Sequence, residues 1–378
     1  MPRERRGSWR VMRIARIDIY LHWSWLGILG LLVLGFRAQL AIGYPELAPT
    51  RLWAYAAIGS VVFLASVLLH ELAHALMAQA RGIDVEGITL YLFGGATEAD
   101  ASSGQARDEL VIAAVGPLAS VGLAAVLWLV ALAVGPDESA LGGLIAYLAV
   151  VNLVLAAFNM TPGLPLDGGR VFRSLVWSAT GDFRKATRWA ASAGVAVGYF
   201  LIGIGLVTFW QGGIGGIWFA AIGWLISQSA RAAVQQEDLR LTFAGLTAAD
   251  VMTPGVVTIP AHSSVAEAVG TQFASANYTT FPVVDGISVI GTLSLRTIRA
   301  LSQDQRASLS AGQAAVPVDP DMVVGLDTSM TSVLEALTRS QQGGRVLVFD
   351  GQALVGIIST SDVVRRNALA ALLDGVRE

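Results

Sequence analysis

The sequence contains no cysteine among its 378 residues, and only 14% of them are charged. Without thiols, disulfide bonds and thiolate metal sites are excluded, so any bound metal ion must be held by His, Asp or Glu. A soluble domain normally carries about 25% charged residues. The net charge of −3 gives no electrostatic reason to expect a nucleic-acid partner. The scarcity of charge therefore points to apolar surroundings.

Apolar side chains make up 54% of the chain and are concentrated before residue 235. A helix needs about 20 predominantly apolar residues to cross a bilayer. Runs of about this length lie at roughly 20–38, 53–80, 109–134, 139–178, 189–209 and 213–232. The sequence therefore predicts a six-span membrane domain over residues 19–235, preceded by a basic N-terminal segment over residues 1–18.

The distribution of basic residues favours one orientation in the cell membrane. With six spans, both ends of the membrane domain lie on the same side. The arginine-rich N-terminus, Arg81 and the basic cluster between Arg170 and Arg188 all fall on that side. Because positive loops stay in the cytoplasm, we expect the N-terminus and everything after residue 235 to be cytoplasmic.

The fourth apolar run is interrupted by the sequence TPGLP at residues 161–165. Each of its two prolines removes a backbone donor and clashes with the preceding helical turn. Such a break is tolerated at membrane depth only where it is buried in protein or lines a wet cavity. The break therefore predicts an internal site near residue 165.

The sequence HELAH at residues 70–74 ends a long apolar run that opens at Trp53. Two histidines four residues apart share one face of a helix and can hold one metal ion. Glu71, between them, is placed to take a proton from a metal-bound water. The alternative is that His70 and His74 only pack polar helices together, but ionisable groups in a span are costly and usually functional. The motif indicates hydrolysis carried out within a membrane.

A catalytic zinc site needs a third protein ligand besides the two histidines. The candidates in the membrane domain are His22 and Asp167. Asp167 follows the proline break directly, and a carboxylate in an apolar span needs a strong cationic partner, so we expect Asp167 to be the ligand. Its alternative role is to cap the following helix. For His22, in the aromatic segment LHWSW, anchoring at the membrane interface is the expected role.

Two segments near these motifs are candidates for substrate binding. Asn159 precedes the proline break, and its amide can bond the substrate carbonyl or the developing oxyanion. The alternative for Asn159 is a bond to backbone groups that the prolines leave free. Residues 85–95 are rich in strand-forming side chains, and we expect them to offer an edge strand that pairs with extended substrate. A surface hairpin that plugs the bundle is the alternative for this segment.

Beyond residue 235 the sequence becomes more polar and contains an internal repeat. Asp285-Gly286 matches Asp350-Gly351, Gly291 matches Gly356 and Thr297 matches Asp362, all at an offset of 65 residues. Short β-branched runs alternate with helical ones in both copies. The repeat predicts two similar α/β modules, at 246–303 and 311–370, packed as a pair.

The combination of these motifs resembles a known family. HELAH in one span, NMTPGLPLDGG in a later one and a paired C-terminal module are together similar to the site-2 protease family (M50) of intramembrane zinc metalloproteases. The similarity is to the branch with C-terminal CBS domains. Gly116-Pro117 also matches the family's pattern in the third span, and small residues there indicate tight helix packing. The resemblance implies a multi-pass α-helical membrane protein with a soluble α/β CBS pair.

The resemblance also implies roles for individual residues. His70, His74 and Asp167 would be the ligands of one zinc ion per chain, Glu71 the catalytic base and Asn159 a substrate-positioning residue. The implied reaction is hydrolysis of a peptide bond in or near a transmembrane helix. The implied substrate is a single-span membrane protein, such as an anti-sigma factor or a membrane-tethered transcription factor.

CBS pairs often bind adenine nucleotides, and the resemblance implies a nucleotide site at Ser359 and Asp362. The matching residues of the first repeat are Ser294 and Thr297, so the acid is absent there. At most one complete site is therefore expected. A purely structural or dimerising pair, which would make the protein a homodimer through its CBS repeats, remains an alternative.

The rival function is transport, because CBS pairs also regulate channels and metal-ion transporters, and buried His and Asp groups can mark an ion path. Glu71 distinguishes the two functions. A transport site needs ligands, whereas only a hydrolase needs a base that lies between the histidines and does not bind the metal.

Overall fold

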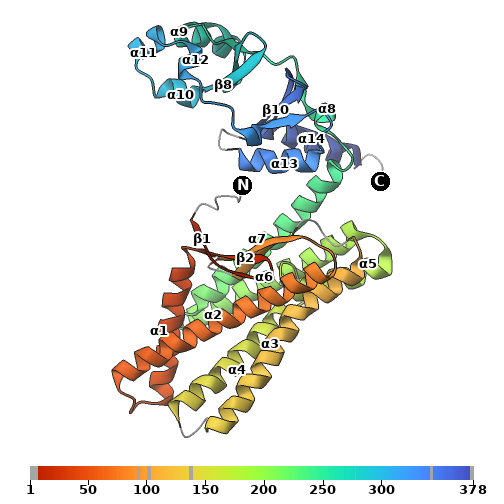
Figure 1. Ribbon diagram of the computed structural model, residues 1–378. Coiled ribbons are helices and arrows are strands. Elements are labelled where there is room, and N and C mark those ends of the chain that lie inside the picture. Colours follow the sequence, from red (N-terminus) through yellow and green to blue (C-terminus); the bar gives the residue numbers. More distant parts are fainter. Residues whose placement is uncertain are drawn as a thin grey trace. The chain divides into compact units, whose positions relative to one another are not determined.

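The structure is a computed structural model that describes residues 7–91, 94–99, 104–135, 139–276, 278–340 and 344–374. The chain divides into two compact units, Met1–Glu237 and Asp238–Glu378 (Figure 1). The first unit is mostly helical and the second is mixed α/β.

Among the described residues, five helices of the first unit are long and apolar enough to cross a membrane. They are α1 (Trp25–Gly43), α2 (Pro49–Ala80), α3 (Ala106–Val134), α4 (Ala140–Asn159) and α6 (Phe183–Trp210). The chain is therefore a multi-pass membrane protein, which confirms the predicted fold class. The remaining helices of this unit are α5 (Asp167–Thr180) and α7 (Gly216–Thr242).

Two of the expected spans do not form a single membrane-spanning helix among the five described above. The fourth run, 139–178, is divided at the prolines into α4 and the short amphipathic α5. The sixth run falls in α7, which is apolar from Gly216 to Ser227 and then carries charged residues such as Arg231. That polar second half explains why α7 is not one of the five helices above.

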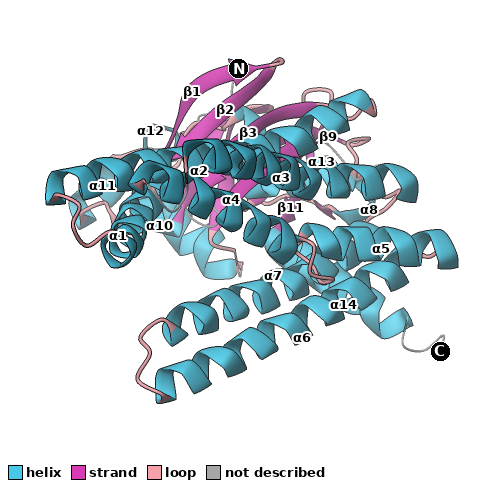
Figure 2. Cartoon of the chain, turned by 90° about the horizontal axis from the view of Figure 1, so that it is seen from below, coloured by secondary structure: helices cyan, strands magenta, loops and turns pink. Residues whose placement is uncertain are grey.

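A four-stranded sheet covers one side of the first unit, a feature that the hydropathy pattern did not predict. Its strands are β1 (Ser8–Ile14), β2 (Ile17–His22), β3 (Val85–Tyr91) and β4 (Gly94–Ala99), in that order across the sheet. Figure 2 shows β1, β2 and β3 side by side. The fully buried Ile17 and Ile88 belong to one apolar cluster with Ala75 and Ala78 of α2. The sheet therefore packs on the part of α2 that follows HELAH.

The sheet order corrects one expectation. β3 pairs with β2 on one edge and with β4 on the other, so the strand after α2 is an interior strand. Residues 92 and 93 of the expected edge segment lie outside the described residues. The expected segment 85–95 therefore contains β3 and the first two residues of its antiparallel partner β4, which is an outer strand of this sheet. This pairing matches the hairpin alternative for the segment.

The second unit consists of two α/β halves whose hairpins match. β7 (Thr280–Asp285) and β8 (Ser288–Ser294) turn at Gly286, and β10 (Arg345–Asp350) and β11 (Ala353–Ser359) turn at Gly351. Both glycines have a φ of 61°, in the region that glycine adopts without strain. The repeated Asp-Gly thus marks the same turn in each half.

The two halves are connected by pairing between strands of different halves. The first sheet is β6-β7-β8, with β6 at Ile259–Pro260. The second is β5-β11-β10-β9, with β5 at Thr253–Pro254 and β9 at Val323–Gly325. By sequence β5 lies within the first repeat, but it pairs with β11 of the second half. The helices are α8 (Ala248–Val251), α9 (Val265–Ala268), α10 (Leu295–Arg299), α11 (Gln303–Ser308), α12 (Ala311–Ala314), α13 (Met330–Arg339) and α14 (Thr360–Asp374).

Candidate metal centre

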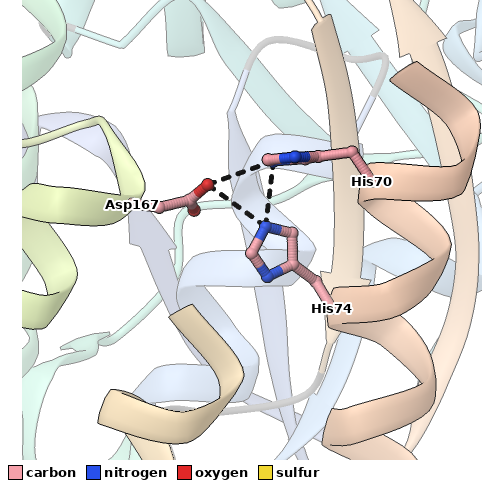
Figure 3. Close-up of side chains that lie close together, drawn as sticks. All are labelled: His70, His74 and Asp167. Carbon is pink, nitrogen blue, oxygen red and sulfur yellow. Dashed lines mark hydrogen bonds and ion pairs between the residues drawn. The ribbon is translucent and has the colours of Figure 1, made fainter. Parts of the chain in front are cut away.

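The two histidines of HELAH lie on one face of α2 and are nearly inaccessible, with 4% of His70 and 6% of His74 exposed. Their Nε2 atoms are 3.2 Å apart. Oδ2 of Asp167 lies 3.1 Å from Nε2 of His70 and 3.2 Å from Nε2 of His74 (Figure 3). Asp167 lies 93 and 97 positions after the two histidines in the sequence, yet all three residues direct a potential ligand atom to one place.

The spacing of these atoms fits a zinc ion. Ligand atoms held about 2.0–2.1 Å from zinc in a tetrahedron are about 3.3 Å from one another. Nδ1 of His74 lies 2.6 Å from the carbonyl oxygen of Ile112, which can only accept, so the proton of a neutral His74 ring is on Nδ1. The Nε2 lone pair then faces the Asp167 carboxylate oxygen. Two such electron-rich atoms are stable at this distance when a cation lies between them, so the residues fit the metal.

The third helix supports both imidazoles from behind. Nδ1 of His70 hydrogen-bonds with Oγ of Ser120 at 3.0 Å, and Nδ1 of His74 donates to the Ile112 carbonyl. Ser120 is 2% exposed. Outer hydrogen bonds of this kind fix the orientation of a metal-binding imidazole. α3 therefore orients the two imidazoles of α2, and none of its described residues belongs to the group of potential ligands.

Gly116 lets α3 approach the His74 ring. A Cβ atom at position 116 would lie 2.1 Å from Nε2 of His74, far inside van der Waals contact. The sequence indicated tight packing at Gly116-Pro117, and the structure shows that the packing partner is the His74 imidazole. Any side chain at residue 116 would displace that ring.

Asp167 is brought to the histidines by the irregular segment between α4 and α5. The backbone N–H of Leu164 donates to the carbonyl of Ala190 in α6, at 3.0 Å. A Cβ on Gly194 would lie 1.9 Å from the Leu164 carbonyl oxygen, so only glycine permits this contact. The N-cap of α5 is Leu166, and Asp167 is the first residue of the helix. The side chain of Asp167 is therefore directed to the histidines and does not cap the helix.

The other predicted residues of the membrane domain occupy three different places. Glu71 is half-buried beside His70 and close enough to His74 to interact with it electrostatically, but it is not part of the His70, His74 and Asp167 group. Asn159 is the half-buried last residue of α4. The His22 ring lies next to Trp23 and Tyr91, with centroid distances of 5.5 and 5.3 Å, and is outside the group.

Sequence reasoning missed a buried ion pair beside the site. Glu109 of α3 is 4% exposed, and its Oε1 accepts from Nε of Arg173 at 2.8 Å and from Nη2 of the same residue. The available signal was a glutamate in the third apolar run and an arginine six residues after Asp167. Their pairing was not visible because they lie 64 positions apart.

In the second unit, the predicted nucleotide residues interact with each other. Oδ2 of Asp362 accepts from the backbone N–H of Ser359 at 3.0 Å and from its Oγ at 2.6 Å. A cavity of about 560 Å³ lies at the matching residues of the first half, Ser294 and Thr297. Its lining also includes Thr279, Thr280, Thr292, Arg296 and Arg345.

Comparisons with known proteins match both units. The profile of Peptidase family M50 matches residues 58–141 and 135–203, and the profile of the CBS domain matches 248–304 and 314–368. The Mycobacterium tuberculosis protein named zinc metalloprotease Rip3 is 36% identical over 360 residues, which are 93% of this chain and 91% of that protein. A zinc metalloprotease of Methanocaldococcus jannaschii is 27% identical over 98% of this chain and 99% of its own length. Among solved structures, a site-2 protease from Methanocaldococcus jannaschii matches at 26% identity with a TM-score of 0.44, over 60% of this chain and 95% of that one.

Proposed function

This chain belongs to peptidase family M50 and is a zinc metalloprotease of the site-2 type, and we propose that it cleaves a peptide bond in or near a transmembrane helix of a regulatory membrane protein. The observation that carries the proposal is the convergence of His70, His74 and Asp167 to within 3.2 Å of one another in a unit built of membrane-spanning helices. We propose these three residues as the ligands of one zinc ion per chain.

The roles of the chain's own residues follow from their positions. Zinc, when bound, supplies Lewis acidity that polarises the substrate carbonyl and makes water a stronger acid. Glu71, outside the ligand group, accepts the proton of the attacking water and delivers it to the nitrogen of the leaving amine. Asn159, at the end of α4 where the chain turns toward Asp167, donates its amide N–H to the substrate carbonyl oxygen.

The proposed substrate is a single-span membrane protein, such as an anti-sigma factor or a membrane-tethered transcription factor. The test is co-expression of the chain with candidate single-span proteins, followed by product masses from wild type and Glu71→Gln. A product that appears only with wild type supports the proposal. Products that are identical with both proteins exclude Glu71 as the base. A metal flux without any product would favour the rival function, a CBS-regulated transporter or channel.

We propose that the N-terminus and the CBS unit are cytoplasmic. The support is the number of basic residues before α1, in α5 and in the first turns of α6, together with the return of the chain through α7. Because the chain has no cysteine, single thiols can be introduced at Arg10 and at Glu46, both exposed. In intact cells, a membrane-impermeant maleimide should label Glu46→Cys and spare Arg10→Cys. The reverse pattern would overturn the orientation.

A second candidate function, nucleotide sensing, is favoured by the cavity of about 560 Å³ in the CBS unit. Its lining has five hydroxyl side chains and two guanidinium groups, a set that suits a phosphorylated, hydroxyl-rich ligand such as an adenine nucleotide. Burial lowers the pKa of Arg345, because the cation has lost water that an anion would replace.

Equilibrium dialysis of ATP, AMP and adenosine against the full chain tests this candidate. Arg345→Gln should weaken binding of the two phosphorylated ligands, whereas Arg339→Gln, at an exposed ion pair, should not. If none of the three binds, the structural or dimerising role of the CBS pair is favoured. The sedimentation of the purified protein in detergent then decides whether it is a homodimer.

A further inference from the structure

A single face of α3 contacts the residues proposed to hold the metal. The carbonyl of Ile112 and the backbone at Gly116 meet His74, and Ser120 meets His70. These positions are four residues apart, so they follow one another along one side of the helix. Glu109 precedes Ile112 by three residues and lies on the same side.

Glu109 connects this face to the helix that carries the third ligand. Its Oε1 accepts two hydrogen bonds from the guanidinium of Arg173 and lies 4.0 Å from Nε of Arg170. Both arginines belong to α5, which begins with Asp167. Glu109 therefore meets α5 one and two turns after the proposed ligand.

The carboxylate of this ion pair is buried and its guanidinium is half-buried. The side chain of Glu109 is 5% exposed and that of Arg173 is 17% exposed. A buried carboxylate without a partner is strongly destabilising, and a guanidinium restricts its partner through several directed N–H groups. The directed bonds between the carboxylate and the guanidinium thus restrain the separation and rotation of the two helices.

α5 needs such a restraint because it is not a continuation of α4. The residues between the two helices, 160–166, are irregular, so helix geometry alone does not determine where Asp167 lies relative to α2. The Asp167 oxygen must nevertheless stay within 3.2 Å of both imidazoles. A displacement of about 1 Å at a site of this kind is enough to impair it.

We propose that Glu109 is a positioning residue that holds Asp167 at the metal through Arg173. The proposal rests on the proposed function, since it presumes that Asp167 is a ligand. Glu109 does not contact the metal. It acts through α5, so its loss should weaken the contribution of Asp167 and leave the His70 and His74 pair in place.

The test measures zinc affinity of the full-length protein in detergent by chelator competition, with Co²⁺ absorption as a second readout of coordination geometry. Glu109→Gln should bind zinc more weakly than wild type, by no more than the roughly 10- to 100-fold that follows loss of a group bonded directly to a metal ligand. Its Co²⁺ spectrum should lose intensity in the tetrahedral bands. Arg173→Lys keeps the positive charge but lacks the planar set of N–H donors, so its zinc affinity should fall by less than that of Glu109→Gln. Combining Glu109→Arg with Arg173→Glu should recover most of the affinity lost in Glu109→Arg.

The matched control is Asp108→Asn. Asp108 is the adjacent acid of the same helical turn, but its partner is Arg81, the residue directly after α2. Wild-type affinity and spectrum in Asp108→Asn, with losses in both Glu109→Gln and Arg173→Lys, support the proposal. Wild-type zinc affinity in Arg173→Lys and in a folded Glu109→Gln overturns it. Wild-type affinity in Asp167→Asn overturns instead the ligand set on which the proposed function rests.

Discussion

Nε2 of His70 lies 3.1 Å from Oδ2 of Asp167, although 97 residues separate them in the sequence. The histidine is fixed in a long continuous helix, and the aspartate begins a short helix after an irregular segment. The centre thus depends on packing between helices that no local pattern specifies. This dependence makes the helix contacts around the site testable.

Substituting Gly116 with alanine should remove the metal without unfolding the chain. The added Cβ would lie 2.1 Å from Nε2 of His74, so the ring must move away from the ligand position. Alanine within a helix is otherwise stabilising by about 0.5–1 kcal/mol relative to glycine. Gly122→Ala on the same helix is the control, because that Cβ meets nothing within 4 Å. Zinc content should fall in Gly116→Ala and stay normal in Gly122→Ala, whereas full zinc content in both would contradict the observed contact.

Ser120→Ala should weaken zinc binding with little effect on stability. The hydroxyl hydrogen-bonds with Nδ1 of His70, and its removal leaves the imidazole free to rotate. Loss of such a partner typically lowers metal affinity roughly 10- to 100-fold. Ser60→Ala is the matched control variant, because Ser60 is also buried but donates its hydrogen bond to the carbonyl of Ala56. Equal zinc affinities of the two variants, measured by chelator competition, would exclude a role for Ser120 in orienting His70.

Glu71→Gln should separate metal binding from catalysis. Glu71 is outside the ligand group, so the amide should leave zinc content unchanged while cleavage falls by at least about 100-fold, the range for a lost general base. Both quantities are measured on one preparation, with Glu335→Gln in the CBS unit as the control. Residual cleavage near the wild-type rate would show that another group moves the proton.

Acidification should release zinc from the wild-type protein. Both imidazoles must be neutral to bind metal, and protons compete for the same Nε2 atoms. Zinc retained after dialysis should therefore fall as the pH is lowered, and Ser120→Ala should release zinc at a higher pH than wild type. An identical release profile for the two proteins would contradict the proposed support of His70.

The parts of the site that follow from local spacing were predictable from the sequence. HELAH specifies two histidines on one helical face, and the isolated acid after TPGLP suggested the third ligand. The offset of 65 residues between Asp285-Gly286 and Asp350-Gly351 likewise predicted two similar modules, and the structure places both pairs at hairpin turns.

The features that were missed depend on partners distant in sequence. β1 and β2 precede the first span, and the pairing of β2 with β3 joins residues about 70 positions apart. Strand alternation in so short a segment was hidden by the apolar run that follows it. The Glu109 and Arg173 pair was also not predicted, because the two residues lie 64 positions apart and neither charge alone indicates its partner. The interior position of β3 could not be predicted, because the sequence analysis did not identify β4 as its second partner strand.

The most direct test of the metal centre is the amount of zinc bound per chain in purified wild type and in Asp167→Ala, after dialysis against a mild chelator. We expect one zinc ion in wild type and a nearly complete loss in Asp167→Ala, with the helical content of both proteins unchanged. A folded Asp167→Ala that keeps its zinc as firmly as wild type would contradict the assignment of Asp167 as the third ligand.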